Sequence, residues 1–164
     1  MRRTLIIGSV ATVALLAGLF SYQLRQQEAT PRSDFVLQNL QGEPVSAQNF
    51  DGQLVLLNFW APWCAPCRAE IPMLNELQTQ YGKQGLQILG PAVDQEAAVQ
   101  DFVQKTPIRY PVLLGMTAVM RLQDSYGEQA LPFSVLISRQ GQIIYKHAGE
   151  LKRETIEPII RQNL

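Results

Sequence analysis

The sequence contains few cysteines and histidines, the residues that hold zinc in structural sites. Its 164 residues include two cysteines and one histidine, whereas a structural zinc site takes four such ligands. This shortage argues against a zinc protein, and we expect no metal and no other cofactor. The two cysteines stand only three positions apart, as Cys64 and Cys67, so their spacing needs an explanation.

The chain also lacks a net charge. Lysine and arginine together number 14, and so do aspartate and glutamate. A surface that binds nucleic acid needs a basic surplus to neutralise phosphates, so we do not expect nucleic acid as a partner. No internal repeat or low-complexity tract is visible, and the length suits one domain with a buried core.

Long hydrophobic runs are absent except at the N-terminus. There, Arg2 and Arg3 precede an apolar run that begins at residue 5, and no charge follows until Arg25. That length is sufficient to span a bilayer. A cleavable signal peptide opens in the same way, but no small-x-small cleavage site follows and no cysteine could take a lipid. A buried core helix would have a polar face. We therefore predict a signal-anchor transmembrane helix within residues 1–27.

This anchor would set the orientation of the chain. Positively charged flanks tend to stay in the cytoplasm, so the rest of the chain would cross the membrane. We predict a single-pass protein of the bacterial inner membrane. Residues 28–33 would form a tether, and residues 34–164 would form a catalytic domain in the periplasm.

Apolar stretches alternate with helical ones beyond the tether. Residues 53–60, QLVLLNFW, form a continuous apolar run that suits a strand buried on both faces. We expect an edge strand at residues 34–40, followed by a turn at 41–44. Further strands are expected at 85–93, 109–114, 133–138 and 142–149, and the last two of these should form a hairpin. We expect helices at 65–81, with Gly82 as a stop signal, and at 95–105, 117–123 and 152–162. This alternation predicts an α/β fold with a mixed central sheet flanked by helices.

The cysteine pair lies between the buried strand and the first helix. At a helix N-terminus, unpaired N–H groups and the helix dipole favour an anion, and cysteine pKa values there fall from about 8.5 to between about 3.5 and 7.5. Cys64 would be the cap and could attack a substrate disulfide. Cys67, one turn into the helix, could then attack Cys64 and release the reduced substrate. Pro66 is tolerated in a first helical turn.

Other roles for the pair fit less well. A structural disulfide normally closes a longer loop, a zinc site needs more ligands, and ordinary buried thiols would not explain the position. A bare CxxC motif is a weak signal, but its place after a strand and before a helix strengthens it. We predict that Cys64 and Cys67 form a redox-active disulfide.

The segment NFWAPWCAPCRAEIP, residues 58–72, resembles the active-site segment of the thioredoxin superfamily. It is most similar to the membrane-anchored TlpA/ResA/CcmG(DsbE)-like thiol–disulfide oxidoreductases. The likeness continues through ALPFSVLISRQGQIIYKHAGEL, residues 130–151, to the terminal helix. It implies a thioredoxin-like fold with the cysteines exposed at the end of a central strand.

The resemblance also implies roles for residues that bind substrate. The peptide bond before Pro132 would be cis and its loop would face the cysteines, so Leu131 and Pro132 would pair with an extended substrate chain. An ordinary loop proline is the alternative. Trp63 would shield the Cys64 sulfur and offer an apolar platform to substrate, whereas we expect Trp60 to pack in the core.

A departure from the thioredoxin pattern draws attention to one acidic residue. Thioredoxins themselves have a buried aspartate where this chain has Asn58, and an amide cannot accept the proton that Cys67 must release. In ResA-like relatives, a glutamate at the position of Glu70 lies beside the cysteines. We hypothesise that Glu70 handles this proton; the alternative is a solvated glutamate on an exposed helix face.

The resemblance implies a disulfide reductase that acts on exported proteins with cysteine pairs, with apocytochrome c as one candidate. A membrane thiol carrier would supply the electrons. Two other classes remain open: a non-catalytic binding or metal-handling module, and a peroxidase of the related peroxiredoxin branch. Both thiols lie in one CxxC, which argues against the peroxidase. The lone His147 is expected to be non-catalytic, which argues against copper delivery.

Overall fold

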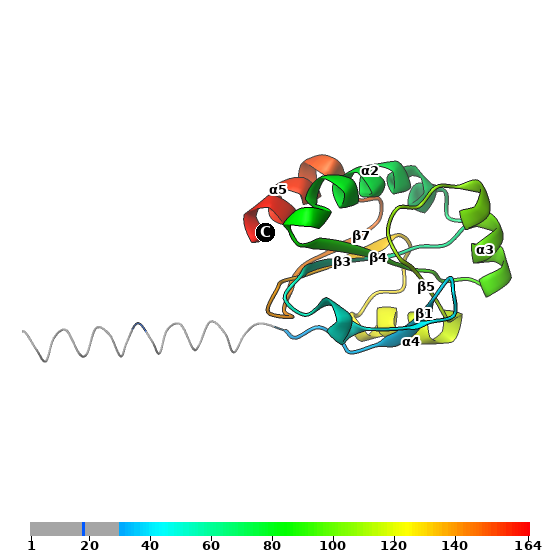
Figure 1. Ribbon diagram of the computed structural model, residues 1–164, viewed down its shortest axis with the longest axis horizontal. Coiled ribbons are helices and arrows are strands. Elements are labelled where there is room, and N and C mark those ends of the chain that lie inside the picture. The colour runs from blue at the N-terminus through cyan, green and yellow to red at the C-terminus, as the bar shows by residue number, and fades with distance from the viewer. Residues whose placement is uncertain (1–17, 19–29) are drawn as a thin grey trace, which may run out of the picture. The chain divides into compact units, whose positions relative to one another are not determined.

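This computed structural model describes Gly18 and residues 30–164. A seven-stranded mixed sheet forms the centre of residues 31–164 (Figure 1). The strands run in the order β2-β1-β5-β4-β3-β6-β7. Their bounds are β1 Val36–Asn39, β2 Pro44–Ser46, β3 Leu54–Phe59, β4 Leu86–Pro91, β5 Val112–Leu114, β6 Phe133–Ile137 and β7 Ile143–Ala148.

The three central strands β3, β4 and β5 are parallel, and β1, β2, β6 and β7 pair antiparallel with their neighbours. The carboxyl ends of the parallel strands therefore share one edge of the sheet, where open α/β sheets usually bind their ligands. All six residues of β3 are buried, as the apolar run predicted. The mixed sheet and the β6–β7 hairpin are confirmed.

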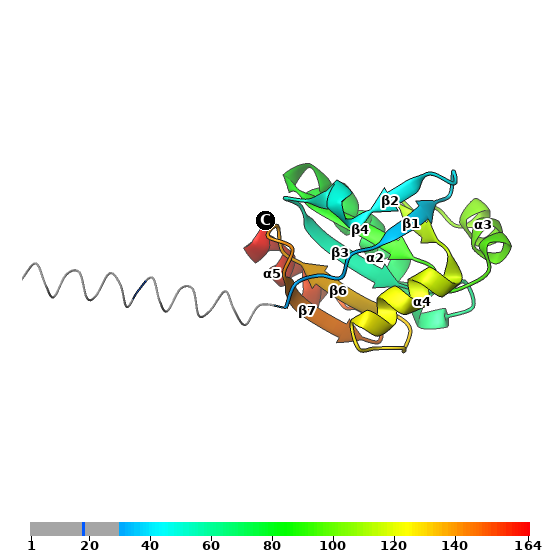
Figure 2. The same cartoon turned by 90° about the horizontal axis from the view of Figure 1, so that it is seen from below.

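Helices cover both faces of this sheet (Figures 1 and 2). The α-helices are α2 Ala65–Tyr81, α3 Glu96–Lys105, α4 Met116–Ser125 and α5 Arg153–Asn163, with 3-10 turns η1 Ala47–Phe50 and η2 Gly82–Gln84. Leucine and isoleucine side chains of α2 and α5 pack with Leu56 and Ile88. Val119 of α4 packs with Leu57 and Leu89 on the opposite face.

The edge of the sheet differs from the prediction. We expected residues 34–40 to form an edge strand, but β1 lies between β2 and β5, and β2 is the edge. The chain turns back because Asn39 Oδ1 accepts hydrogen bonds from the backbone N–H groups of Gln41 and Glu43. The expected turn after β1 is therefore correct, but it leads into a second strand that was missed.

The end of α2 also differs in detail. The helix ends at Tyr81, as predicted, but Gly82 keeps a right-handed conformation and begins η2. The left-handed residue is Gly85, with φ of 108°, where a side chain would be strained. The turn into β4 therefore depends on Gly85, whereas Gly82 is only the C-cap of α2.

The predicted anchor over residues 1–27 lies outside the described residues. Within the part that the structure describes, no helix is long and apolar enough to cross a bilayer.

Candidate active site

Cys64 lies where β3 gives way to α2. The chain leaves β3 at Phe59, and Cys64 has the extended backbone of an N-cap, with φ of −78° and ψ of 107°. The backbone N–H of Cys67 points at Cys64 Sγ, with 3.3 Å between nitrogen and sulfur. The structure thus places the leading sulfur against a free helical N–H, which is the geometry that stabilises a thiolate.

The two cysteines form a disulfide, with their Cα atoms 5.3 Å apart. Cys64 is 5% exposed and Cys67 is fully buried. The resemblance implied more exposed sulfurs, and this expectation is corrected: both pack among apolar side chains that include Trp60, Ala61 and Ala92. Only Cys64 offers any surface to a partner, which suits it to attack and suits Cys67 to resolve.

The two tryptophans of the loop have opposite environments. Trp60 is 1% exposed, donates its Nε1–H to the carbonyl of Gly90 at 3.2 Å, and packs against Phe102. Its expected place in the core is confirmed. Trp63 is 66% exposed, immediately before Cys64. An exposed tryptophan beside the reactive sulfur can contact a docked chain.

The Leu131–Pro132 peptide bond is cis, as the resemblance implied. β6 runs antiparallel to β3, and Phe133 pairs with Phe59. Because the start of β6 therefore lies beside the end of β3, this loop is brought to the edge of the sheet that carries the cysteines. Leu131 packs against the same apolar cluster as both cysteines.

Glu70 is buried, with 2% of its surface exposed. Its Oε1 accepts a 2.7 Å hydrogen bond from Asn58 Nδ2, and its Oε2 accepts a 2.8 Å hydrogen bond from the backbone N–H of Leu151. Burial raises the pKa of Glu70 from 4.5 to about 7, although these two hydrogen bonds oppose the shift. The solvated alternative for Glu70 is therefore wrong.

Two residues of the hydrogen-bond network around this buried carboxyl were missed from the sequence. Ser134 Oγ accepts the second hydrogen bond of Asn58 Nδ2, at 3.1 Å, and Leu151 contributes its backbone N–H. Ser134 is a polar residue inside the otherwise apolar strand FSVLI, a pattern that could have marked it. A backbone donor such as that of Leu151 leaves no signal in the sequence.

His147 lies on β7 with both ring nitrogens engaged. Nδ1 is 3.3 Å from Tyr145 Oη, and Nε2 is 3.2 Å from the carbonyl oxygen of Glu150. The structure gives it a local hydrogen-bonding role in the β7 hairpin and the loop that follows.

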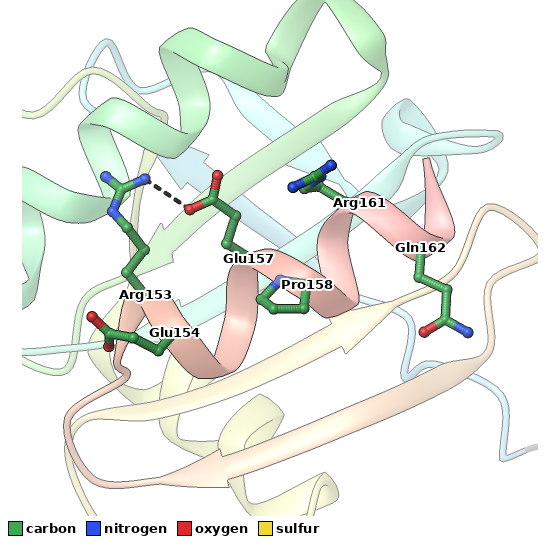
Figure 3. Close-up of a pocket in the computed structure, with 6 residues that line it drawn as sticks. All are labelled: Arg153, Glu154, Glu157, Pro158, Arg161 and Gln162. Carbon is green, nitrogen blue, oxygen red and sulfur yellow. Dashed lines mark hydrogen bonds and ion pairs between the residues drawn. The ribbon is translucent and has the colours of Figure 1, made fainter.

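A pocket of about 660 Å³ lies over α5 (Figure 3). The described residues that line it carry charges of both signs, and two of them, Arg153 and Glu157, form an ion pair with each other. They include neither cysteine and none of the residues predicted to bind substrate.

The chain is similar to proteins of one family over most of its length. The model of the AhpC/TSA family matches residues 28–146. The protein named thiol-disulfide oxidoreductase ResA of Bacillus cereus is 31% identical over 159 residues, which cover 96% of this chain and 91% of that protein. The ResA protein of Halalkalibacterium halodurans is 33% identical over 127 residues, 76% of this chain and 70% of that one.

Solved structures show the same fold. A thiol:disulfide interchange protein of the thioredoxin family from Chlorobium tepidum superposes with a TM-score of 0.75 at 27% identity, covering 83% of this chain and 97% of that chain. A thiol-disulfide oxidoreductase from Bacteroides fragilis has a TM-score of 0.73 at 26% identity, with 82% and 100% coverage. The predicted thioredoxin-like fold is confirmed.

Proposed function

The chain belongs to the AhpC/TSA family and is a thiol–disulfide oxidoreductase, and we propose that it reduces disulfide bonds in exported proteins. The observation that carries this proposal is the Cys64–Cys67 disulfide at the N-terminus of α2, in which Cys64 keeps 5% of its surface exposed and Cys67 none. The relatives named ResA support the activity, and the bacterial origin of the reported relatives supports a bacterial setting.

The exchange proceeds in two balanced steps from the dithiol form. The Cys64 thiolate attacks one sulfur of the substrate disulfide, so that a Cys64–substrate bond forms and the first substrate thiolate leaves. Cys67 loses its proton and attacks Cys64 Sγ, which reforms the Cys64–Cys67 disulfide and expels the second thiolate. The substrate gains two electrons and the enzyme loses two.

Glu70 is proposed as the group that takes the proton from Cys67. It lies on α2 three residues after Cys67 and is buried with it. A carboxyl with a pKa of about 7 can both accept and return a proton near neutral pH. An ordinary surface glutamate would be a much weaker base in this range.

Substrate is proposed to lie over Trp63 and along the loop at Leu131 and Pro132. Trp63 supplies exposed apolar area beside Cys64. The loop supplies backbone next to the start of β6 for pairing with an extended chain, a mode of recognition that depends little on substrate sequence. Such a surface suits an enzyme that acts on several exported proteins.

The proposed setting is the periplasmic side of the bacterial inner membrane. The apolar N-terminal run with Arg2 and Arg3 ahead of it supports a single-pass anchor. A reductase in that compartment needs electrons, and we propose a membrane thiol carrier as the donor. Apocytochrome c, which must present reduced cysteines for haem attachment, is a candidate substrate.

The test is to trap the mixed disulfide. In the full-length chain with Cys67→Ser, Cys64 can attack but cannot be resolved, so disulfide-linked partners should accumulate and should disappear on reduction. Cys64→Ser is the matched control and should trap none. If Cys64→Ser traps partners and Cys67→Ser does not, the roles of the two cysteines are reversed.

The family also makes peroxide consumption worth measuring. The arrangement of both thiols in one CxxC disulfide favours disulfide exchange. Peroxide turnover by the purified protein faster than exchange with a model protein disulfide would replace the reductase proposal.

A further inference from the structure

Two buried tyrosine hydroxyls have no hydrogen-bond partner in the part of the chain that the structure describes, those of Tyr110 and Tyr126. Buried polar groups are nearly always paired, so each exception calls for an explanation. Tyr110 is 5% exposed and precedes β5. Its surroundings indicate what the hydroxyl is for.

Tyr110 packs over a glycine beside the buried carboxyl site. A Cβ atom on Gly90 would lie 3.0 Å from Tyr110 Cε2 and 3.1 Å from Trp60 Nε1, so the glycine makes room for both rings. Leu57 pairs with Leu89 in the parallel β3–β4 register. One residue further on each strand, Asn58 and Gly90 are therefore neighbours on the face that α2 covers.

The negative charge of Glu70 acts on the phenol of Tyr110. Burial is the main cause that raises the pKa of Tyr110 above its usual value, and the negative charge of Glu70 adds to it. Other charges also act on Glu70 from the loop between β7 and α5: Glu150 raises its pKa and Lys152 lowers it. Tyr110, which precedes β5, packs at Gly90, and Gly90 neighbours Asn58, the residue that donates to this carboxyl.

The hydrogen bonds of Glu70 suit only one of its two protonation states. Asn58 Nδ2 and the Leu151 N–H are both donors, and they satisfy an ionised carboxylate. A protonated carboxyl gains an O–H that needs an acceptor. Asn58 Nδ2 cannot serve as one, whereas the unpaired hydroxyl oxygen of Tyr110 can.

We propose that the Tyr110 hydroxyl accepts a hydrogen bond from the protonated Glu70 carboxyl and is thereby a positioning residue for the proton step. The bond forms after a small rotation of the carboxyl or through one buried water, which is nearly as favourable as direct contact. This inference rests on the proposed proton role of Glu70. It gives a role to a buried hydroxyl that has no hydrogen-bond partner among the described residues.

The test is the titration of Glu70 in Tyr110→Phe, which removes one oxygen and keeps the ring against Gly90 and Trp60. Carbon-13 NMR of the labelled glutamate carboxyls gives the midpoint in the oxidised protein. Because an acceptor stabilises the protonated form, its loss should move the Glu70 midpoint to lower pH. An unchanged midpoint overturns the proposal, and a higher one does so too, since it would mean that Tyr110 donates to the ionised carboxylate.

Tyr126→Phe is the matched control. It also removes a buried tyrosine hydroxyl, but Tyr126 packs against Phe59 in the cluster on the α4 face. The Glu70 midpoint should stay at its wild-type value. An equal shift in both variants would overturn the proposal, because it would reflect a general loss of packing.

A second measurement keeps the test decisive if Tyr110→Phe does not fold. In the wild-type protein, the Tyr110 Cζ resonance should change with the same midpoint as the Glu70 carboxyl, and an invariant resonance contradicts the proposal.

Failure of the proposed function has a different signature. If Glu70→Gln leaves the pH profile of disulfide exchange unchanged, Glu70 has no proton role, whether or not Tyr110 shifts its midpoint.

Discussion

Asn58 Nδ2 donates a 2.7 Å hydrogen bond to Glu70 Oε1, and this contact ties β3 to α2 one turn beyond the disulfide. The same amide nitrogen donates to Ser134 Oγ on β6. Leu151 N–H holds the other oxygen of Glu70. Two strands and the loop before α5 thus fix a titratable carboxyl under the redox-active end of the helix.

Asn58→Asp should split the titration of this site into two steps. The variant replaces a donor by a second carboxyl at hydrogen-bond distance from Glu70, and two carboxylates so close cannot both ionise readily. One proton should therefore be held to a pH above the wild-type midpoint. The free energy of unfolding at high pH should fall by about 3 kcal/mol, as for a broken buried polar pair.

Urea unfolding over a range of pH measures this effect. Ser134→Ala is the control, since it removes a neutral partner of Asn58 and should cost about 1 kcal/mol at every pH. Parallel pH profiles for Asn58→Asp and the wild type would contradict the prediction.

Glu70→Gln should flatten the pH dependence of stability. The pKa of Glu70 is raised from 4.5 to about 7 on folding, so the protonated form is favoured in the native state. The corresponding stability is fully present below the unfolded pKa and is lost as pH rises through the folded pKa. At roughly 1.4 kcal/mol per unit, the wild type should lose about 3 kcal/mol across this window.

Glutamine cannot titrate, so the variant should lose much less stability between those pH values. The comparison uses the slope with pH, because the amide also changes the hydrogen bonds to Asn58 and Leu151. A slope as steep as that of the wild type would show that other groups cause the loss.

Trp63→Ala and Trp60→Ala should affect different properties. Trp63 is 66% exposed, so its removal should change the free energy of unfolding by less than about 0.5 kcal/mol and should raise the KM for protein disulfides. Trp60 is buried, so its removal should cost about 3 to 5 kcal/mol. Chemical denaturation together with a steady-state insulin-reduction assay separates the two. A large stability loss in Trp63→Ala would contradict its proposed role as a platform.

The parts of the fold with strong local patterns could be predicted from the sequence. β3 is a continuous apolar run and is buried along its whole length, and α2 has the predicted bounds. β2 was missed because three residues that begin with a proline carry no usable alternation. Its existence depends on the turn that Asn39 stabilises, which makes β1 an inner strand.

The residues of the candidate site also divide into those that the sequence could predict and those that it could not. Cys64 and Cys67 could be placed because the strand, the cap and the helix are adjacent in the sequence. The buried state of Glu70 could not be predicted, because its partner Leu151 lies 81 positions away and acts through its backbone. The cis bond at Pro132 was expected only through the resemblance, since local sequence gives no such preference for this proline.

The central claim is that, in the reduced protein, Cys64 is held as a thiolate where α2 begins. The most direct test is the titration of its thiol in reduced Cys67→Ser, followed by thiolate absorbance in the folded protein and again in urea. The account predicts a pKa in the folded protein well below that of the same thiol in the unfolded chain. A folded-state pKa equal to or above the unfolded value would contradict it.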